Sequence, residues 1–309
     1  MNARRHVVAG ALFDAAGRVL LAQRPAHKDL PLTWEFPGGK CESGEAPAAA
    51  LQRELHEELG IEIGEIEPVI AVPWDYGRAP FLLDVRRVRD FRGEPHGREG
   101  QALCWAALDE LAAIDMPPAD RPAVAALRLP PLYAITPEPT ADDFLPRLER
   151  LFAAGVRLVQ LRAKALSDHA LRALAVRADA LAAAHSATLL LNDHAELARE
   201  LGLGVHLSTA SLRRATSRPL PPDRWLGASC HDAAELAHAA AIGADFAVLG
   251  PLAATASHPD AAPLGWGRFE ELVAEAALPV YALGGVGPAD LGAARAAGAQ
   301  GVAGISAFW

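Results

Sequence analysis

Three glutamates, Glu54, Glu57 and Glu58, are spaced so that a helix would bring their carboxylates onto one face. Like charges three and four residues apart destabilise a helix, so the cluster predicts a cation that neutralises it. Carboxylate oxygens are hard ligands that suit Mg²⁺, with Mn²⁺ as a second candidate. A glycine-rich turn at residues 37–39 comes before the expected helix and lets backbone approach a ligand closely. The segment therefore predicts a carboxylate metal site.

The neighbouring elements must hold these carboxylates in place. Pro47 suits a first helical turn and Gly60 a helix end, so residues 46–59 are predicted to form the carboxylate helix. A proline-rich stretch at residues 116–131 predicts a domain boundary near Pro130. Before it, strands are expected at residues 6–13, 18–23, 66–74, 80–88 and 102–106, and a short helix at 109–113.

Beyond Pro130 the pattern changes, because short apolar runs alternate with alanine-rich helical segments. Eight strands in alternation with helices predict a compact, closed (β/α)₈ barrel, with a doubly wound open sheet as the alternative. The chain is thus expected to be α/β throughout, with domains at residues 1–129 and 130–309. The barrel strands are expected at residues 132–136, 157–162, 187–191, 203–207, 225–230, 245–250, 279–283 and 301–305, and helices at 142–154, 168–184, 194–200, 232–242, 268–276 and 288–297.

Composition restricts the classes of function. The 309 residues favour two domains, and a formal net charge of −9 leaves no basic footprint for nucleic acid. We therefore expect a small-molecule nucleotide or pyrophosphate substrate, without direct nucleic-acid binding. The 3 cysteines are widely separated and odd in number, which favours a reducing, cytoplasmic compartment without structural zinc. No apolar stretch is long enough to span a bilayer, so no membrane contact is expected.

Residues 39–61 resemble the Nudix box, in which glycine, glutamate and an Arg-Glu…Glu-Glu core stand at fixed spacing. Strings at residues 34–40, 93–101 and 117–119 are similar to MutT-type Nudix enzymes, which hydrolyse oxidised guanine nucleotides to the monophosphate. The resemblance covers nearly all of residues 5–128 and implies a Nudix α/β/α sandwich with a mixed sheet. The positions that fill the box are Gly39, Glu45, Arg53, Glu54, Leu55, Glu57, Glu58, Gly60 and Ile61.

The resemblance also implies roles for single residues. The catalytic metal ligands would be the carboxylates of Glu54, Glu57 and Glu58, together with the carbonyl of Gly38. Glu99, on a distant loop, would be a further catalytic group, as a metal ligand or as a base. The residues expected to bind the nucleotide are Arg24, Phe36, Gly39, Lys40 and Asp120.

Asp120 departs from the oxidised-guanine enzymes, which carry Asn after this Pro-Pro-Ala string. Asn offers a base both a donor and an acceptor, whereas an ionised Asp offers acceptors only. Ionised Asp120 could accept the N7–H of 8-oxoguanine but would face its O6 acceptor unfavourably. Burial can raise a carboxyl pKa enough to keep Asp120 protonated, which would restore the donor. Alternatively, Asp120 pairs with Arg121 and leaves the base pocket altered.

The second half resembles the thiamine phosphate synthase/TenI superfamily of (β/α)₈ barrels over about residues 131–309. The strings that carry the resemblance lie at residues 132–136, 160–164, 191–193, 204–207, 250–251, 284–286 and 305–307. Loops after the seventh and eighth strands of such barrels bind phosphate through backbone N–H groups. The resemblance implies that Asp193 holds Mg²⁺, and that the ligand is bound by Gln160, Arg162, Lys164, Asn192, Gly285 and Ser306.

Two departures weaken the synthase interpretation. Synthases carry a second acidic Mg²⁺ ligand where this chain has residues 208–211, and a lysine where it has residues 255–258. The sister TenI-type thiazole tautomerases also lack the second acid and use a histidine, matched by His231, as proton shuttle. A neutral imidazole suits a 1,3-proton shift, although His231 could equally be a structural residue at a helix start. The barrel could thus be a synthase, a tautomerase or inactive, and take a phosphorylated thiazole or pyrimidine.

Three functions stay open on the sequence. In the first, the Nudix half hydrolyses oxidised nucleoside triphosphates, with 8-oxo-dGTP giving 8-oxo-dGMP and diphosphate. In the second, both halves serve thiamine metabolism, and the Nudix half hydrolyses a pyrimidine or thiamine pyrophosphate. In the third, the barrel is a catalytically inactive module that senses a ligand and regulates the Nudix half.

Overall fold

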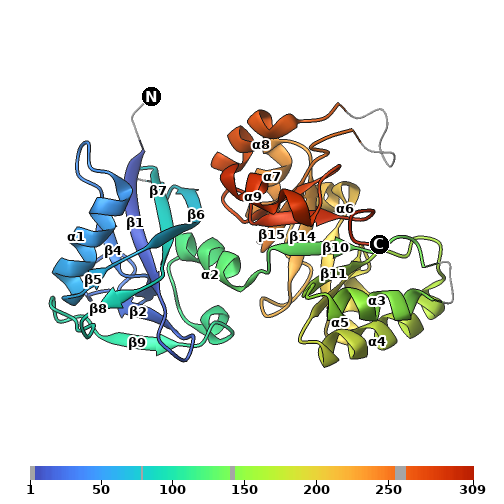
Figure 1. The fold of residues 1–309 in the computed structure, drawn as a ribbon, viewed down its shortest axis with the longest axis horizontal. Helices are drawn as coiled ribbons and strands as arrows, with labels where there is room; N and C mark the ends of the chain where they lie inside the picture. The colour runs from blue at the N-terminus through green and yellow to red at the C-terminus, as the bar shows by residue number, and fades with distance from the viewer. Residues whose placement is uncertain (1–3, 78, 140–142, 255–261) are drawn as a thin grey trace. The chain divides into compact units, whose positions relative to one another are not determined.

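The computed structural model describes residues 4–77, 79–139, 143–254 and 262–309 (Figure 1). The chain divides into two compact units, Met1–Arg128 and Leu129–Trp309. Within the described ranges, no helix is long and apolar enough to cross a bilayer.

A mixed sheet forms the centre of the N-terminal unit. The strands of this unit are β1 (Arg5–Leu12), β2 (Val19–Gln23), β3 (Trp34–Glu35), β4 (Gly38–Lys40), β5 (Glu62–Ile63), β6 (Ile66–Trp74), β7 (Phe81–Val88), β8 (Phe91–Arg92) and β9 (Leu103–Ala106). Strand β1 pairs antiparallel with β4 and parallel with β7, and β7 pairs antiparallel with β6. A second sheet has the order β3-β2-β9, and β5 pairs with β8. The predicted mixed sheet is therefore confirmed.

Helix α1 (Pro47–Leu59) packs on this sheet through one apolar stripe (Figure 1). Leu51, Leu55 and Leu59 are four residues apart and fully buried, as expected for one face of a helix. Gly60 adopts the left-handed conformation that commonly ends a helix, with φ 73°. Glu54 and Glu58 lie beside strand β4 at the edge of this sheet, whereas Glu57 is exposed.

The proline-rich stretch contains a helix that the sequence pattern did not predict. Helix α2 (Arg121–Arg128) follows the 3₁₀ turn η2 (Pro118–Asp120), and buries residues 123–127. Its Pro122 lies in the first turn, where the missing N–H of proline costs nothing. The short helix expected at residues 109–113 is the 3₁₀ helix η1 (Glu110–Ala113).

Eight parallel strands close into a barrel in the second unit, because β17 pairs with β10. The closed ring confirms the predicted barrel and excludes the doubly wound open sheet. These strands are β10 (Leu132–Ile135), β11 (Leu158–Leu161), β12 (Thr188–Asn192), β13 (Gly204–Leu207), β14 (Leu226–Cys230), β15 (Phe246–Leu249), β16 (Val280–Leu283) and β17 (Gly301–Gly304).

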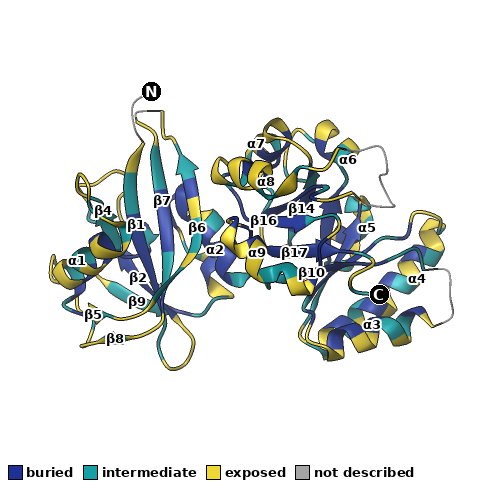
Figure 2. Ribbon diagram, turned by 45° about the horizontal axis from the view of Figure 1, so that its top comes forward, coloured by how far each residue is buried: buried dark blue, intermediate teal, exposed yellow. Residues whose placement is uncertain are grey.

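Helices cover the outside of the barrel, and Figure 2 shows buried strands surrounded by helices with exposed outer faces. Inside, the rings of Tyr133, Phe246 and Tyr281 pack together with centroids 5.3–5.6 Å apart. Among the helices, α6 was not predicted. The helices are α3 (Phe144–Ala153), α4 (Asp168–Ala184), α5 (Ala195–Leu201), α6 (Thr209–Arg214), α7 (Ala233–Ala241), α8 (Gly265–Ala274), η3 (Pro288–Asp290) and α9 (Leu291–Ala296).

Candidate active sites

Strand β4 lies tightly between β1 and α1, and only glycine fits there. A Cβ on Gly38, whose φ is 151°, would lie 2.2 Å from the carbonyl oxygen of Val8. A Cβ on Gly39 would lie 2.2 Å from Oε2 of Glu54. The two glycines therefore allow the backbone to lie directly against the first carboxylate of the predicted metal site.

Arg53 fixes the start of the carboxylate cluster. Its guanidinium donates to both carboxylate oxygens of Glu45, at 3.0 and 2.9 Å, and to Oε1 of Glu54 at 2.9 Å. It also donates to the carbonyl oxygen of Lys40 at 3.1 Å. The hydrogen bonds from Arg53 hold the pKa of Glu45 below its ordinary value. Arg53 thus joins α1 to the loop before it and orients Glu54.

A distant loop brings Glu99 to the same cluster. The backbone N–H of Arg98 and the side-chain amide of Gln101 both donate to the carbonyl oxygen of Glu58, at 3.0 and 3.2 Å. Gln101 also accepts the backbone N–H of Glu99 at 2.9 Å. Burial, followed by the carboxylates of Glu99 and Glu54, raises the pKa of Glu58 to about 7. Three predicted carboxylates therefore converge.

The fourth carboxylate, Glu57, is exposed and lies 3.6 Å from Nη1 of Arg53. Within the described residues, no three His, Cys, Asp or Glu side chains are already arranged to hold a metal ion. The donor set nevertheless fits a hard divalent cation, because it consists of carboxylate oxygens. Burial is the main cause of the raised pKa of Glu58, and the Glu99 and Glu54 carboxylates add to it; a cation beside these carboxylates would lower this pKa.

The residues expected to form the base pocket lie near this cluster, since the carboxylate of Glu35, next to Phe36, contributes to the raised pKa of Glu58. Among these residues, Asp120 is only 5% exposed and accepts a hydrogen bond from the Phe36 backbone. Burial and then Glu35 raise the pKa of Asp120 to about 8. Arg121 is exposed, and no ion pair joins it to Asp120 in the described part of the chain. Asp120 is thus mostly protonated at neutral pH and offers a donor as well as an acceptor.

Two further residues of this pocket were not predicted. Glu35 forms an ion pair with Arg24, and burial raises the pKa of Glu35 although Arg24 opposes the shift. Tyr76 is 46% exposed, and its hydroxyl accepts the Ala119 N–H at 3.4 Å. Glu35 could have been noticed as the neighbour of Phe36 in the W-E-F-P-G-G string. No sequence pattern indicated Tyr76, because only the folded chain brings its hydroxyl to the Ala119 N–H.

The predicted barrel residues all lie at one end of the barrel. Each stands near the carboxyl end of a strand or in the loop that follows it. All of them therefore lie at the mouth that the carboxyl ends of the strands form. Gly285, after β16, has φ 70°, and a Cβ there would lie 2.7 Å from Cβ of Ala253. The residues at this mouth are Gln160, Arg162, Lys164, Asn192, Asp193, His231, Gly285 and Ser306.

Asp193, the expected Mg²⁺ ligand, has φ 62° and accepts the Ser208 N–H at 2.7 Å. Ser208 caps α6 by accepting the Ser211 N–H at 3.3 Å. Residues 208–211, where synthases carry the second acidic ligand, therefore form the capped start of α6. The residues 255–258, where the synthase lysine is missing, lie outside the described residues.

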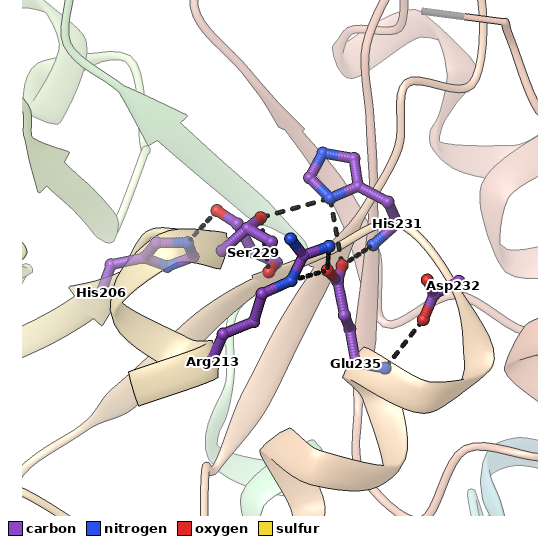
Figure 3. A network of polar contacts seen from close by, with 7 residues as sticks. His206, Arg213, Ser229, His231, Asp232 and Glu235 are labelled. Carbon is purple, nitrogen blue, oxygen red and sulfur yellow. Dashed lines mark hydrogen bonds and ion pairs between the residues drawn. The ribbon is translucent and has the colours of Figure 1, made fainter. Parts of the chain in front are cut away.

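A hydrogen-bonded chain runs through the barrel interior to this mouth. Gln160 donates to the Tyr133 hydroxyl at 3.0 Å, which leaves that hydroxyl to donate to Nδ1 of His206 at 3.0 Å. Burial lowers the pKa of His206 to about 4, so the neutral ring carries its proton on Nε2 and donates to Ser229 at 2.9 Å (Figure 3). The Ser229 hydroxyl hydrogen then has no acceptor among the described residues. Sequence reasoning missed this chain, although His206 lies in the G-V-H-L string.

His231 belongs to a second polar cluster at the mouth (Figure 3). Its Nδ1 lies 3.1 Å from Glu235 Oε2 and 3.2 Å from Thr209 Oγ1. Its backbone N–H donates to the same Glu235 oxygen at 2.8 Å, and Arg213 donates to the other oxygen at 3.0 and 2.6 Å. Only His231 was predicted. The four-residue spacing between His231 and Glu235, at the start of α7, could have indicated that the two side chains meet.

Comparison with known proteins decides what the two units are. A family model described as "Thiamine monophosphate synthase" matches residues 132–308, more than half of the chain, and one described as "NUDIX domain" matches residues 3–127. The chain belongs to the thiamine monophosphate synthase family and carries a Nudix domain. Nudix hydrolases generally use divalent metal ions such as Mg²⁺.

Curated relatives agree with both assignments. The thiamine biosynthesis bifunctional protein ThiM/ThiE of Symbiobacterium thermophilum is 38% identical over 294 residues, which cover 94% of this chain and 58% of that protein. Thiamine-phosphate synthase of Desulfitobacterium hafniense is 36% identical over 54% of this chain and 82% of its own. The 8-oxo-dGTP diphosphatase of Haemophilus influenzae is 38% identical over 37% of this chain and 84% of its own. The predicted family memberships are therefore confirmed.

In the Nudix domain, the fold brings Glu54, Glu58 and Glu99 together and leaves Glu57 at the edge of the cluster. Lys40 is exposed and contributes its carbonyl to Arg53. In the thiamine-synthase barrel, the predicted residues share the mouth but form separate groups. His231 lies with Glu235 and Thr209, whereas Gln160 belongs to the interior chain that ends at Ser229.

Proposed function

We propose that the Nudix domain is a Mg²⁺-dependent pyrophosphohydrolase of oxidised nucleoside triphosphates, with Mn²⁺ as the alternative metal. The observation that carries the proposal is the convergence of the Glu54, Glu58 and Glu99 carboxylates. With Glu57 and the Gly38 carbonyl, they would hold the cation. The cation would neutralise phosphate oxygens and lower the pKa of the attacking water.

The chain's own residues divide the remaining work. Glu99 would accept a proton from the attacking water or complete the metal site. Arg53 keeps Glu54 turned towards the backbone of Gly39, so that the first ligand is already oriented. Lys40, exposed beside the cluster, would meet the negative phosphates.

The buried Asp120 supports 8-oxo-dGTP as the first substrate. Protonated Asp120 would donate to O6 of 8-oxoguanine and accept its N7–H, as Asn does in the oxidised-guanine enzymes. The Phe36 backbone donates to Asp120, Arg24 lies close enough to oppose the rise in its pKa, and the relative named 8-oxo-dGTP diphosphatase supports this choice. The expected products are 8-oxo-dGMP and diphosphate.

CTP is the second candidate substrate. The CTP pyrophosphohydrolase of Escherichia coli is 40% identical over 119 residues, which cover 38% of this chain and 88% of that protein. A protonated Asp120 could also donate to N3 of cytosine and accept its N4–H. The hydrogen-bonding groups of protonated Asp120 therefore suit both 8-oxoguanine and cytosine, and an experiment must distinguish the two substrates.

The thiamine-synthase barrel would bind a phosphorylated thiazole or pyrimidine at its mouth. Its phosphate would lie at the backbone N–H groups that follow β16 and β17. A tautomerase with His231 as its acid-base group is favoured over a synthase, because residues 208–211 form a capped helix start without a carboxylate. The proposed ligand-binding residues are Gln160, Arg162, Lys164, Asn192, Asp193 (through Mg²⁺), Gly285 and Ser306.

The deciding experiment measures Mg²⁺-dependent kcat/KM for 8-oxo-dGTP, dGTP, CTP and hydroxymethylpyrimidine pyrophosphate. We expect 8-oxo-dGTP to be preferred and Glu57→Gln to lose about 10²-fold or more in kcat/KM, within the range of a single acid-base or electrostatic group. Glu62→Gln, which removes an exposed carboxylate on β5, is the control and should retain full activity. A preference for the pyrimidine pyrophosphate would instead place both halves in thiamine metabolism.

A further inference from the structure

The two neighbours of His231 Nδ1 both act as acceptors. Glu235 is a carboxylate, and its Oε2 lies 3.1 Å from Nδ1. The Thr209 hydroxyl has one hydrogen, which it donates to the Ser229 carbonyl oxygen at 3.1 Å, so towards Nδ1 it can only accept. Both contacts therefore require a hydrogen on Nδ1.

Glu235 is held so that it cannot turn away from the ring. Its side chain is only 6% exposed, and Arg213 donates twice to Oε1 while the His231 backbone N–H and Nδ1 face Oε2. The Asp232 side chain fixes the start of α7 by accepting the Glu235 N–H at 2.9 Å. All four contacts of the carboxylate agree on one orientation (Figure 3).

We propose that Glu235 and Thr209 are positioning residues that hold neutral His231 in the Nδ1–H tautomer, with an unprotonated Nε2 at the barrel mouth. The proposal deepens the proposed function of the barrel and rests on His231 being its acid-base group. Nε2 has no partner among the described residues, and the His231 side chain is 49% exposed. The ring can therefore accept a proton from a bound ligand without first changing its tautomer.

The adjacent Ser229 extends this inference to the kind of ligand. Ser229 and His231 stand two residues apart at the carboxyl end of β14, and Thr209 contacts both, since it donates to the Ser229 carbonyl oxygen and lies 3.2 Å from His231 Nδ1. The hydroxyl of Ser229 is a donor, whereas Nε2 of His231 is an acceptor. The mouth therefore suits a ligand that presents an acceptor beside an acidic C–H or N–H.

The proton balance of such a step closes within the site. The ligand's C–H or N–H bond breaks, its electron pair stays on the ligand, and the proton joins Nε2 to give an imidazolium. The Glu235 carboxylate stabilises that cation through Nδ1–H. The N–H bond at Nε2 then breaks as the proton returns to another ligand atom, which leaves His231 unchanged.

Nitrogen NMR of the full chain, labelled with ¹⁵N only in histidine, tests the proposal at pH 8. The His231 signals are assigned by their loss in His231→Gln. We expect Nδ1 to be protonated and Nε2 to be bare, with a tautomer ratio of at least about tenfold, as a charge-assisted hydrogen bond would give. Glu235→Gln should reduce this ratio by roughly tenfold, and Thr209→Val should reduce it less. Glu271→Gln, an exposed carboxylate on α8, is the matched control and should leave it unchanged.

The outcomes separate this proposal from the function on which it rests. A wild-type His231 that carries its hydrogen on Nε2 overturns the proposal without the need for any variant. An Nδ1–H tautomer that persists unchanged in both variants also overturns it, since neither neighbour would then position the ring. If the tautomer behaves as expected but His231→Gln leaves turnover of a thiazole phosphate unchanged, the positioning stands and the acid-base role fails.

Discussion

Burial changes what the carboxyl group of Asp120 can do. An acid in place of Asn would lose the donor if it were ionised, but Asp120 is shielded from water and faces Glu35, and both effects raise its pKa to about 8. The group therefore keeps its proton at neutral pH and offers both a donor and an acceptor, as the amide of Asn does. The local environment, rather than the residue type, decides whether the pocket can read a purine edge.

The first prediction follows from the direction of this shift. Below pH 8 Asp120 is protonated and donates, and above pH 8 it ionises and opposes an acceptor on the base. We expect kcat/KM for 8-oxo-dGTP to fall by about tenfold per pH unit above 8 in the wild type, whereas Asp120→Asn should remove this decrease. Activity of the two proteins at pH 7 should agree within a few fold. A wild-type decrease that survives in Asp120→Asn would assign the ionisation to another group.

The second prediction concerns Tyr133, whose hydroxyl joins Gln160 and His206 inside the barrel. Tyr133→Phe removes the central link and leaves a buried donor and a buried acceptor without partners. Each unsatisfied buried group costs about 1–3 kcal/mol, so the free energy of unfolding should fall by at least that amount. Urea denaturation measures the change.

Tyr76→Phe is the control for Tyr133→Phe. It removes a hydroxyl that is half exposed and accepts one long hydrogen bond. Its effect on stability should be smaller than that of Tyr133→Phe, because one long hydrogen bond is lost instead of two within a buried chain. Equal losses in the two variants would show that the interior chain does not stabilise the barrel.

At the scale of elements, the fit of β4 against α1 is the most sensitive contact. Gly39→Ala would place a methyl group 2.2 Å from the Glu54 carboxylate, so either strand or helix must shift. We expect the Mg²⁺-dependent kcat/KM to fall by about 10²-fold, because small displacements of a catalytic group carry large costs. Gly267→Ala on α8, where a Cβ meets nothing within 4 Å, should leave hydrolysis unchanged. Full activity in Gly39→Ala would mean that the carboxylate site tolerates this displacement.

Periodicity and spacing predicted the elements that depend on local pattern. The leucines of α1 recur every four residues, and the barrel strands are short apolar runs bounded by turns, so both could be placed from the sequence. Helix α2 was missed because prolines that begin the segment were interpreted as breakers, although proline is tolerated in a first turn.

Contacts between elements could not be predicted in the same way. The hydrogen bonds from Arg98 and Gln101 to the end of α1 decide that Glu99 reaches Glu58, and they join residues about forty positions apart. Tyr76 and Thr209 likewise reach their sites only through the folded chain. The resemblance to Nudix enzymes predicted Glu99 as a site residue, whereas residue patterns alone did not.

At the scale of the whole molecule, each unit has a hydrophobic core of its own. One core is built around Leu51 and Leu55 of α1, and the other around the strands and helices of the barrel. Separate cores favour separate unfolding transitions. They also let ligand binding be assigned to one unit, since a ligand stabilises only the unit that binds it.

The last prediction uses this separation to test the metal site. Thermal unfolding of the full chain should show two transitions, of which Tyr133→Phe lowers only the barrel transition. Without a barrel ligand to complete the site at Asp193, Mg²⁺ alone should raise only the other one, by about 2.7 kcal/mol at a hundred times its Kd, and Glu57→Gln should weaken this effect. If Mg²⁺ instead raises the barrel transition, Asp193 rather than the Glu54 cluster becomes the main metal site. If both transitions move together, the two units are coupled, and because coupling is reciprocal a barrel ligand must then change metal or substrate binding by the Nudix domain. That result would favour a regulatory barrel, whereas independent transitions favour two enzymes that share one chain.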